Sequence, residues 1–197
     1  MLKKIAYKYM LMPSIRMRIS QFERLPTPAG GVVFLGDSLT EGGLWHEWFP
    51  EVGTVNRGIN GDTIGNLRAR LDSAIVDPTA VFVLIGTNDL GMGATADEIG
   101  AEMRLLVRAI RDRAPGVPLY LQSVPPRQPK FADRVRALNR AYRTIAEESD
   151  AVYIDLWPAL ADENGGLRAE FTGDGLHLGG AGYSAWAEVL RPHLRRR

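Results

Sequence analysis

The stretch GVVFLGDSLTEGG, residues 31–43, changes abruptly from an apolar run to a polar loop. Its first six residues are apolar or glycine, as in a strand that is buried on both faces of a parallel sheet. Asp37, Ser38 and Thr40 follow at once, with two glycines behind them. Because turns favour Gly, Asp and Ser for backbone reasons alone, the polar part has two explanations. Either the strand ends in an ordinary turn, or it ends by presenting Ser38 as a nucleophile.

Further segments of strand length follow along the chain, with helical patterns between them. The candidate strands span residues 31–36, 52–58, 80–86, 118–124 and 151–156, and apolar residues at helical spacing mark helices over 99–110, 131–145 and 183–194. Strands that alternate with helices of this length predict right-handed βαβ crossovers and a three-layer α/β sandwich. Ligands of such sheets bind at the carboxyl ends of the strands, so the residues after each strand are the candidates for function.

The composition indicates a globular domain without covalent cross-links. The 197 residues include no cysteine, which excludes disulfides, thiolate metal sites and a cysteine nucleophile. The 24 basic and 23 acidic side chains nearly cancel, so no general attraction to nucleic acid is expected. We interpret residues 1–197 as a single domain, with an N-terminal helical segment over 1–25 and a basic C-terminal tail over 191–197.

The N-terminal sequence MLKKIAYKYMLMPSIRMRIS is basic and rich in methionine. Charged residues and a proline interrupt any apolar core of a signal peptide, and no stretch approaches the roughly 20 apolar residues that span a bilayer. Ile15, Ile19 and Phe22 instead predict one face of a short helix that packs on the domain. We therefore expect a cytoplasmic protein without stable membrane insertion, with a peripheral membrane contact of this segment as the alternative.

Polar residues follow the predicted strands at several places. Ser38 follows the first strand, Gly58 ends the second, and Asn88 follows the third in the sequence GTND. Asp174 and His177 lie three residues apart in TGDGLHLGGAGY, before the last helix. A serine hydroxyl is a weak nucleophile that needs an adjacent base, itself held in one tautomer.

His177 is the histidine with a carboxylate three residues before it in a Gly-rich loop. His46 is flanked by aromatic residues in LWHEWF, and His193 lies in the basic tail, where we expect it to be solvated. Asp174 could accept the Nδ1 proton of His177 and leave Nε2 to take the proton of Ser38. Gly-rich loops with Asp and His are common for backbone reasons, so this pair alone does not decide the function.

An acyl-transfer site also needs hydrogen-bond donors for the developing oxyanion. The Ser38 N–H would be available in the first turn of a helix, Gly58 could offer an unobstructed N–H, and Asn88 carries a side-chain amide. Gly58 is equally a turn residue, and Asn88 is equally a helix cap or an Asx-turn residue. The conjunction of these residues at the strand ends favours catalysis.

The blocks GDSLTEGG, RGINGDT, GTND and DGLHL resemble, in this order, those of the SGNH (GDSL-type) hydrolases. This family includes esterases, lipases, thioesterases and platelet-activating-factor acetylhydrolase-like enzymes. The resemblance covers Gly36 to Leu178, almost the whole predicted domain. It implies a flavodoxin-like, three-layer α/β/α sandwich with five parallel strands, which agrees with the strands predicted above.

By position, the resemblance makes Ser38 the nucleophile, His177 the general base and Asp174 its orienting acid. The Ser38 N–H, the Gly58 N–H and the Asn88 side chain would form the oxyanion hole. The expected activity is hydrolysis of small carboxylic esters, with acetyl or other short acyl groups, through an acyl-enzyme and without a metal or organic cofactor. Thioesterase, lysophospholipase and acyltransferase activities use the same residues and are alternatives.

Asp37, Trp45 and Arg127 are the candidate substrate-binding residues. Trp45 lies in LWHEWFP and would wall the acyl pocket, unless these aromatic residues anchor a short helix in the core. Arg127 lies in the Pro-rich loop PPRQPKF, which would cover the site and contact a polar leaving group, or would serve only as a connector.

Binding proteins on the same fold are the rivals from another class. A non-catalytic ligand-binding module would tend to lose the Ser, Asn or His of the motifs. A flavin or nucleotide binder is the other rival, but neither a G-x-G-x-x-G fingerprint nor a G-x-x-x-x-G-K-S/T loop follows a predicted strand. The expected partner is therefore a small ester molecule rather than nucleic acid. The sequence leaves open whether the chain forms a homodimer.

Overall fold

Five parallel strands form the central sheet of this protein, which a computed structural model describes over residues 12–25 and 30–194. The strands are β1 (Val32–Gly36), β2 (Thr54–Gly58), β3 (Ala80–Leu84), β4 (Leu119–Gln122) and β5 (Val152–Ile154), in the spatial order β2-β1-β3-β4-β5. The predicted α/β sandwich with five parallel strands is confirmed. The segments 1–11, 26–29 and 195–197, on which parts of the predicted N-terminal segment, linker and tail fall, lie outside the described residues.

The strand order reverses between β1 and β3, because the chain adds β2 on one side of β1 and β3 on the other. The register pairs Gly36 with both Gly58 and Leu84, so these three strands end at the same level. The edge beside such a reversal is where open α/β sheets bind ligands. Ser38 follows β1 and Asn88 follows β3, so both residues leave the sheet at this edge.

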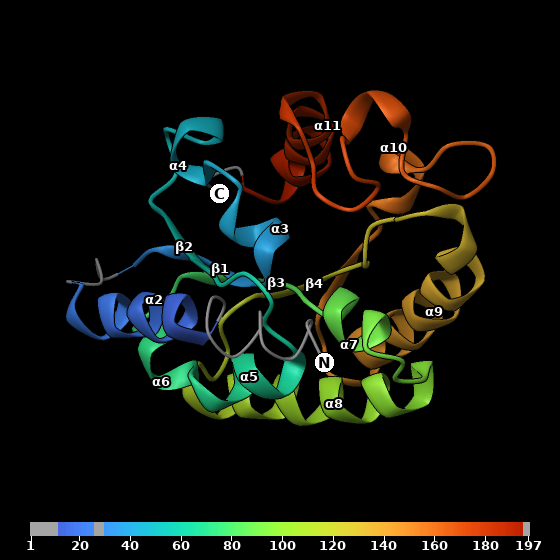
Figure 1. Ribbon diagram of the computed structural model, residues 1–197. Helices are drawn as coiled ribbons and strands as arrows, with labels where there is room; N and C mark the ends of the chain where they lie inside the picture. The colour runs from blue at the N-terminus through green and yellow to red at the C-terminus, as the bar shows by residue number, and fades with distance from the viewer. Residues whose placement is uncertain (1–11, 26–29, 195–197) are drawn as a thin grey trace.

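Helices cover both faces of the sheet (Figure 1). One layer holds α5 (Ile64–Ala69), α6 (Leu71–Ala74), α8 (Ala96–Arg113) and α9 (Ala132–Glu148), and the other holds α3 (Ser38–Glu41), α4 (Trp45–Trp48), α10 (Trp157–Leu160) and α11 (Gly180–Leu190). Successive strand residues point to opposite faces. Val33 and Leu35 therefore join the core cluster of the first layer, and Phe34 joins that of the second.

Shorter elements complete the chain around these layers. Helix α2 (Met12–Arg24) packs through Ile15 and Phe22 against Ile59, just beyond β2, as the apolar spacing predicts. The remaining elements are α7 (Thr87–Gly91) and the 3₁₀ turns η2 (Pro129–Phe131), η3 (Ala169–Phe171) and η4 (Arg191–His193). Within the described ranges, no helix has the length and apolar content that crossing a membrane requires.

The last predicted helix differs from the observed one at its end. The apolar pattern extends to Leu194, but α11 ends at Leu190 and continues as the 3₁₀ turn η4. Pro192 explains the change, because it has no N–H to donate to an α-helical carbonyl. Leu194 is nevertheless buried, so the pattern correctly identified a residue of the core.

Candidate active site

Helix α3 begins at Ser38, directly after the turn that ends β1. The Asp37 side chain caps this helix by accepting a hydrogen bond from the Leu39 N–H at 3.0 Å. Gly36 permits the turn, because a Cβ at this position would collide with Thr40 and with the Leu84 carbonyl. The first amides of a helix have no partner within the helix, and the Ser38 N–H has no acceptor among the described residues. The nucleophile candidate thus combines a half-buried hydroxyl with an available N–H.

Three side chains hold the carbonyl end of this short helix. Asn56 Nδ2 and Trp45 Nε1 both donate to the Thr40 carbonyl, at 2.9 and 3.0 Å. Tyr183 Oη donates to the Leu39 carbonyl at 2.9 Å. A helix of four residues is not stable by itself, because nucleation costs more than so few hydrogen bonds return. Contacts from β2, α4 and α11 therefore position α3 and the hydroxyl of Ser38.

The structure brings Ser38, His177 and Asp174 into one chain of hydrogen bonds. The distance from Ser38 Oγ to His177 Nε2 is 3.1 Å, and the distance from His177 Nδ1 to Asp174 Oδ2 is 2.7 Å. A carboxylate can only accept, so Nδ1 carries the proton and Nε2 faces the serine hydroxyl as an acceptor. This is the arrangement in which an imidazole can take the proton of a serine.

The other oxygen of Asp174 holds the loop that carries both residues. Oδ1 accepts the backbone N–H of His177 at 2.8 Å and that of Leu176 at 2.9 Å. The hydrogen bond from the His177 ring, followed by the one from the His177 backbone, holds the pKa of Asp174 well below its usual range. Because the two side chains are 55% and 50% exposed, solvent screens their ionic attraction. Hydrogen-bond geometry, more than charge, therefore fixes the ring.

Asn88 lies in the first turn of α7, behind Gly86, which has a φ of 116° and thus a conformation that favours glycine. Asn88 Nδ2 donates one hydrogen to the Asp62 carbonyl at 2.8 Å. This bond orients the amide and leaves its second hydrogen for another acceptor. Asp89, the next residue, accepts the Ile64 N–H at 3.3 Å and ties α7 to the start of α5.

Gly58 has its N–H engaged within the protein. The N–H donates to Asn56 Oδ1 at 2.9 Å, and this is possible because β2 is an edge strand whose outward amides have no strand partner. A Cβ on Gly58 would also collide with the backbone of Glu41 and Thr40. The structure therefore explains this glycine by the close contact between β2 and α3, and it does not leave the N–H available as an oxyanion donor.

Gly61 is a donor candidate that the sequence analysis missed. It has a φ of 82° and lies next to Asp62, whose carbonyl holds Asn88. Its N–H has no acceptor among the described residues. The signal in the sequence was the second glycine of the same block, in NGDT, three residues beyond the end of the predicted strand.

Asp37 and Trp45 lie in the interior, which argues against their predicted contact with substrate. Asp37 is fully buried, and burial raises its pKa to about 7, helped by the nearby charges of Asp62 and Asp89. Trp45 is 1% exposed and stacks on Phe34 with ring centroids 4.5 Å apart. The alternative interpretation, an aromatic anchor in the core, describes Trp45 correctly.

Arg127 is half-buried beside α7. Its Nη1 donates to the Thr87 carbonyl at 2.9 Å, and its guanidinium carbon lies 4.2 Å from the centroid of the Phe131 ring. The next residue, Gln128, donates through Nε2 to the Asp174 carbonyl at 3.1 Å. The loop before α9 thus contacts both the segment with Asn88 and the loop with Asp174.

The two remaining histidines lie away from this constellation. His46 is exposed, with Nε2 at 3.5 Å from Glu47. His193 contacts the Tyr120 ring edge-on among residues at the amino ends of the strands, and its partial burial, which differs from the solvated position we expected, lowers its pKa. Over the described ranges, no group of three or more His, Asp or Glu side chains is placed to hold a metal ion.

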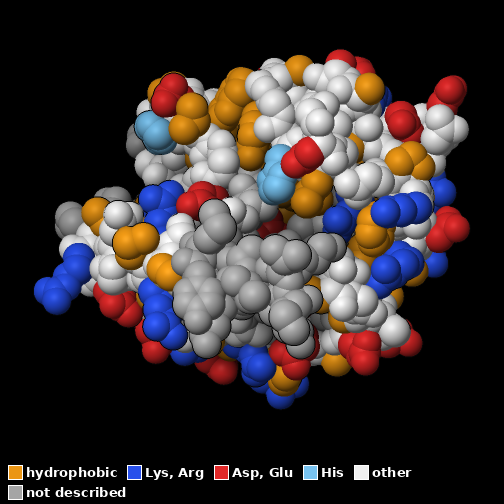
Figure 2. Space-filling model, in the orientation of Figure 1, with side chains coloured by type: hydrophobic (Ala, Val, Ile, Leu, Met, Phe, Trp, Pro, Cys, Tyr) orange, Lys and Arg blue, Asp and Glu red, His pale blue; other side chains and the backbone are white. Residues whose placement is uncertain are grey.

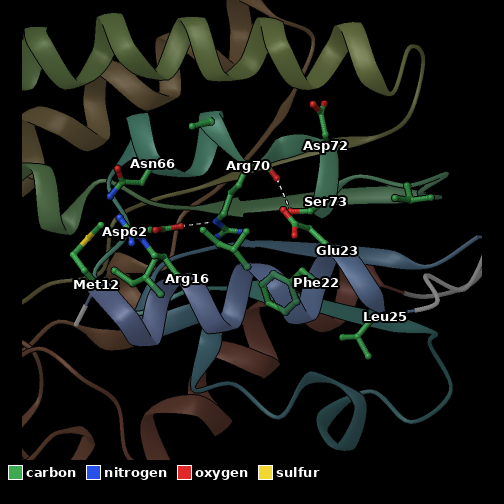
Figure 3. A pocket seen from close by; sticks show the side chains of 14 residues that line it. Met12, Arg16, Phe22, Glu23, Leu25, Asp62, Asn66, Arg70, Asp72 and Ser73 are labelled. Atoms are coloured by element: carbon green, nitrogen blue, oxygen red, sulfur yellow. Dashed lines mark hydrogen bonds and ion pairs between the residues drawn. The ribbon is translucent and has the colours of Figure 1, made fainter. Parts of the chain in front are cut away.

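A separate cavity of about 850 Å³ lies between α2 and the segment that includes α5 and α6 (Figure 3). Met12, Arg16 and Phe22 of α2 line one side, opposite Arg70 and Asp62. Arg70 Nε and Asp62 Oδ2 form a buried ion pair at 2.7 Å, beneath the turn whose Asp62 carbonyl holds Asn88. Ser38 and His177 do not line this cavity, which is therefore separate from the Ser38–His177–Asp174 hydrogen bonds. Its Arg70–Asp62 ion pair supports the turn that holds Asn88.

Comparisons with known proteins fit this geometry. The model of the GDSL-like lipase/acylhydrolase family matches residues 34–185. The chain is 28% identical over 176 residues to platelet-activating factor acetylhydrolase IB subunit alpha1 of Bos taurus, covering 84% of this chain and 75% of that protein. It is 26% identical over 172 residues to the subunit alpha2 of Rattus norvegicus, with coverages of 82% and 73%.

Solved structures share the fold over nearly the full chain. A putative platelet activating factor from Streptococcus pneumonia matches with a TM-score of 0.90 and 26% identity, covering 98% of this chain and 99% of that one. A GDSL-like lipase from Bacteroides thetaiotaomicron matches with a TM-score of 0.77 and 22% identity, covering 91% and 96%. An acetylxylan esterase from Geobacillus stearothermophilus matches with a TM-score of 0.70 and 21% identity, covering 88% and 98%.

Proposed function

Because the chain belongs to the GDSL-like lipase/acylhydrolase family and is a carboxylic ester hydrolase, we propose that it cleaves small esters of short acyl groups through an acyl-enzyme on Ser38. The observation that carries this proposal is the line of hydrogen bonds from Ser38 through His177 to Asp174, at 3.1 and 2.7 Å. The named relatives add support for a short acyl group, because they are acetylhydrolases.

In the first half of the reaction, Ser38 Oγ attacks the ester carbonyl carbon while His177 Nε2 takes the hydroxyl proton. Asp174 keeps Nδ1 protonated and stabilises the imidazolium that forms. The tetrahedral intermediate collapses, and Nε2 gives its proton to the oxygen of the leaving alcohol. In the second half, Nε2 takes a proton from water and the resulting hydroxide attacks the carbonyl carbon of the acyl group. The second tetrahedral intermediate then collapses, the acid is released, and Nε2 returns the proton to Ser38 Oγ.

The developing oxyanion needs donors that are free in the resting protein and aimed at one point. The Ser38 N–H and the second hydrogen of the Asn88 amide have no acceptor among the described residues, which supports their assignment as two of these donors. For the third donor we propose the Gly61 N–H in place of Gly58, since the Gly58 N–H already donates to Asn56. Gly61 precedes Asp62, whose carbonyl accepts a hydrogen bond from the Asn88 amide, so the Gly61 N–H and this amide lie in adjoining segments.

The exposure of the site also favours short acyl groups. The side chains of His177 and Asp174 are half-exposed, so a substrate reaches Ser38 from an open surface. A long acyl chain gains binding energy only where it is enclosed by apolar side chains. The cavity beside α2 cannot supply that enclosure at Ser38, because Ser38 does not line it.

The proposal is tested by comparing p-nitrophenyl acetate, butyrate and octanoate with the native protein and the Ser38→Ala variant. We expect turnover of the acetate and butyrate esters, and a loss of about 10⁴–10⁶ in kcat for Ser38→Ala. Ser20→Ala is the matched control, since this exposed serine lies on α2 and its hydroxyl donates to the Met17 carbonyl. Equal slow rates in all three proteins would remove Ser38 from the mechanism and favour a binding module.

Faster turnover of octanoate than of butyrate would contradict the short acyl group. Release of thiol from a thioester substrate would identify thioesterase activity, and transfer of the acyl group to an added alcohol would identify acyltransferase activity.

A further inference from the structure

Three cationic side chains surround the ring of Phe131 where η2 leads into α9. The guanidinium carbons of Arg127 and Arg134 lie 4.2 and 5.8 Å from the ring centroid, and Lys130 Nζ lies at 5.3 Å. We call Arg127, Lys130 and Arg134 the cation cluster. Lys and Arg side chains gather over the start of α9 on the face shown in Figure 2. A ring with cations at its face and rim is a stable arrangement, but it neutralises none of their charge.

The cation cluster has no carboxylate partner in the described part of the chain. Seven other arginine side chains in the described residues form ion pairs, namely those of Arg18, Arg68, Arg70, Arg104, Arg113, Arg143 and Arg191. Burial and then the charge of Arg134 lower the pKa of Arg127, while the charge of Asp37 acts in the opposite direction. Adjacent like charges repel each other, and an incoming anion would relieve this cost.

The cation cluster adjoins the proposed reaction centre through direct contacts. Arg127 donates to the carbonyl of Thr87, the residue before Asn88, at 2.9 Å. Gln128, which follows Arg127, donates to the carbonyl of Asp174 at 3.1 Å. A group bound at the cluster would therefore lie between the segment of the oxyanion donor and the loop of the general base.

Hydrogen bonds hold the two arginines of the cation cluster in place, whereas its lysine is mobile. Arg134 Nη2 donates to the carbonyls of Leu90 and Ala94, at 3.0 and 3.1 Å, and its other nitrogens have no hydrogen-bond acceptor among the described residues. Arg127 is held by Thr87, while Lys130 is exposed on a flexible stem. Fixed guanidinium groups suit the planar, two-point recognition of phosphate or carboxylate oxygens, and a lysine adds a mobile charge.

We propose that the substrate carries an anionic group, a phosphate or a carboxylate, which the cation cluster of Arg127, Lys130 and Arg134 binds beside the scissile ester. This inference rests on the proposed ester hydrolysis at Ser38 and names a substrate class for that site. It distinguishes anionic esters from neutral esters with the same acyl group. The anionic group can belong to the alcohol or to the acyl part, and the experiment separates these two sources.

The experiment measures kcat/KM for two matched pairs of esters. The first pair is acetylated glycerol 3-phosphate and monoacetylglycerol, and the second is p-nitrophenyl hemisuccinate and p-nitrophenyl butyrate. We expect the native protein to prefer the anionic member of one pair by about tenfold or more, equivalent to about 1.4 kcal/mol. The phosphate pair would place the anion on the alcohol, and the succinate pair would place it on the acyl group. The preference should weaken as salt is added, since the cluster is open to solvent.

Charge-removing variants connect the preference to the cluster. Lys130→Gln and Arg134→Gln should each lower the anionic-to-neutral ratio of kcat/KM about threefold, and the double variant should bring it close to one. Lys130→Glu, at an exposed position that does not threaten folding, should reverse the preference. Arg108→Gln removes the same charge from an exposed site on α8 and should keep the native ratio. A ratio near one in the native protein, or a ratio that the cluster variants leave unchanged, overturns the inference. If the native protein and Ser38→Ala hydrolyse all four esters at the same rate, the proposed function itself is overturned.

Discussion

The hydroxyl of Tyr183 donates to the carbonyl of Leu39 at 2.9 Å and so joins α11 to the helix that begins with Ser38. Tyr183 lies six positions after His177, so one side chain connects the segment of the proposed base to the segment of the proposed nucleophile. The phenol is also packed against Gly42, where a Cβ would collide with it. This contact sets the separation of Ser38 and His177 without touching either of their reacting atoms.

Tyr183→Phe should therefore disturb the position of Ser38 more than the fold. Loss of one partly buried hydrogen bond should lower the free energy of unfolding by about 1 kcal/mol. We expect kcat to fall about threefold to tenfold with little change in KM, because a displaced nucleophile slows the chemical step more than substrate binding. Tyr120→Phe is the control, since this tyrosine stacks on Phe82 away from α3. An unchanged kcat in Tyr183→Phe would reduce the contact to simple packing.

Asp174→Asn tests whether the carboxylate orients the base. An asparagine can keep an oxygen for the two backbone N–H groups, but its amide can present a hydrogen to Nδ1 and favour the wrong tautomer of His177. We expect kcat to fall by about 10³–10⁴ while folding is retained. Because the pKa of Asp174 is held below its usual range, this carboxylate stays ionised well into acid, and its contribution to stability is lost only as the pH falls below that range. Asp72→Asn, at an exposed ion pair, should be active.

Asp37→Asn should change the pH dependence of stability in a defined window. Burial raises the folded-state pKa of Asp37 to about 7, against 3.8 as the ordinary value. The folded protein therefore holds a proton that the unfolded chain releases between about pH 4 and 7, and this group makes stability fall as the pH rises through that window. Asparagine can still accept the Leu39 N–H and has no charge to desolvate. The unfolding free energy of the variant relative to the native protein should rise from pH 4 to 7 and stay level above, as chemical denaturation at several pH values would measure. A difference independent of pH would contradict the raised pKa.

Asn88→Ala tests the proposed oxyanion donor. Removal of one such donor usually costs about 10²–10³ in kcat. The Asp62 carbonyl would also lose its donor, so a small loss of stability is expected as well. Steady-state kinetics on p-nitrophenyl acetate should show a fall in kcat with a nearly constant KM. Asn164→Ala, in the loop after α10, serves as the control and should keep native kinetics.

Gly58→Ala and Gly173→Ala separate packing from catalysis. A methyl group on Gly58 meets the backbone of Glu41 and Thr40, whereas one on Gly173 meets open space. Overpacking of this kind costs about 1–3 kcal/mol, so Gly58→Ala should lower the unfolding temperature and Gly173→Ala should not. A native unfolding temperature in Gly58→Ala would contradict the close contact between β2 and α3.

Much of the site was predictable because its residues follow strands of one parallel sheet. Ser38 and Asn88 come directly after the two strands between which the strand order reverses, and parallel strands end at the same edge. Asp174 and His177 are three residues apart, so their contact is local. Their approach to Ser38 was a prediction from the chemistry that a serine requires, not from spacing along the chain.

Contacts between segments distant in the sequence were not predictable in this way. Asn56 Nδ2 donates to the carbonyls of Thr40 and Gly43, and Asn56 Oδ1 then accepts the Gly58 N–H, so we propose Gly61 as the oxyanion donor instead. Trp45 follows the nucleophile closely but points into the core, where Phe34 stacks on it. In both cases the direction of a side chain, set by its neighbours in space, overrode its position in the motif.

The sequence by itself determined the alternation of strands and helices and the edge at which the sheet carries its polar residues, and it supplied the proposed nucleophile, base and acid. Hydrophobic periodicity and short spacings carry this information, because both act between residues that are near one another along the chain. Only the tertiary structure decided which backbone N–H groups stay free, which polar side chains are buried, and that Arg127, Lys130 and Arg134 meet around Phe131 without an ion-paired carboxylate among the described residues. These outcomes depend on competition among hydrogen-bond partners and on packing between distant segments, which exist only once the chain has folded.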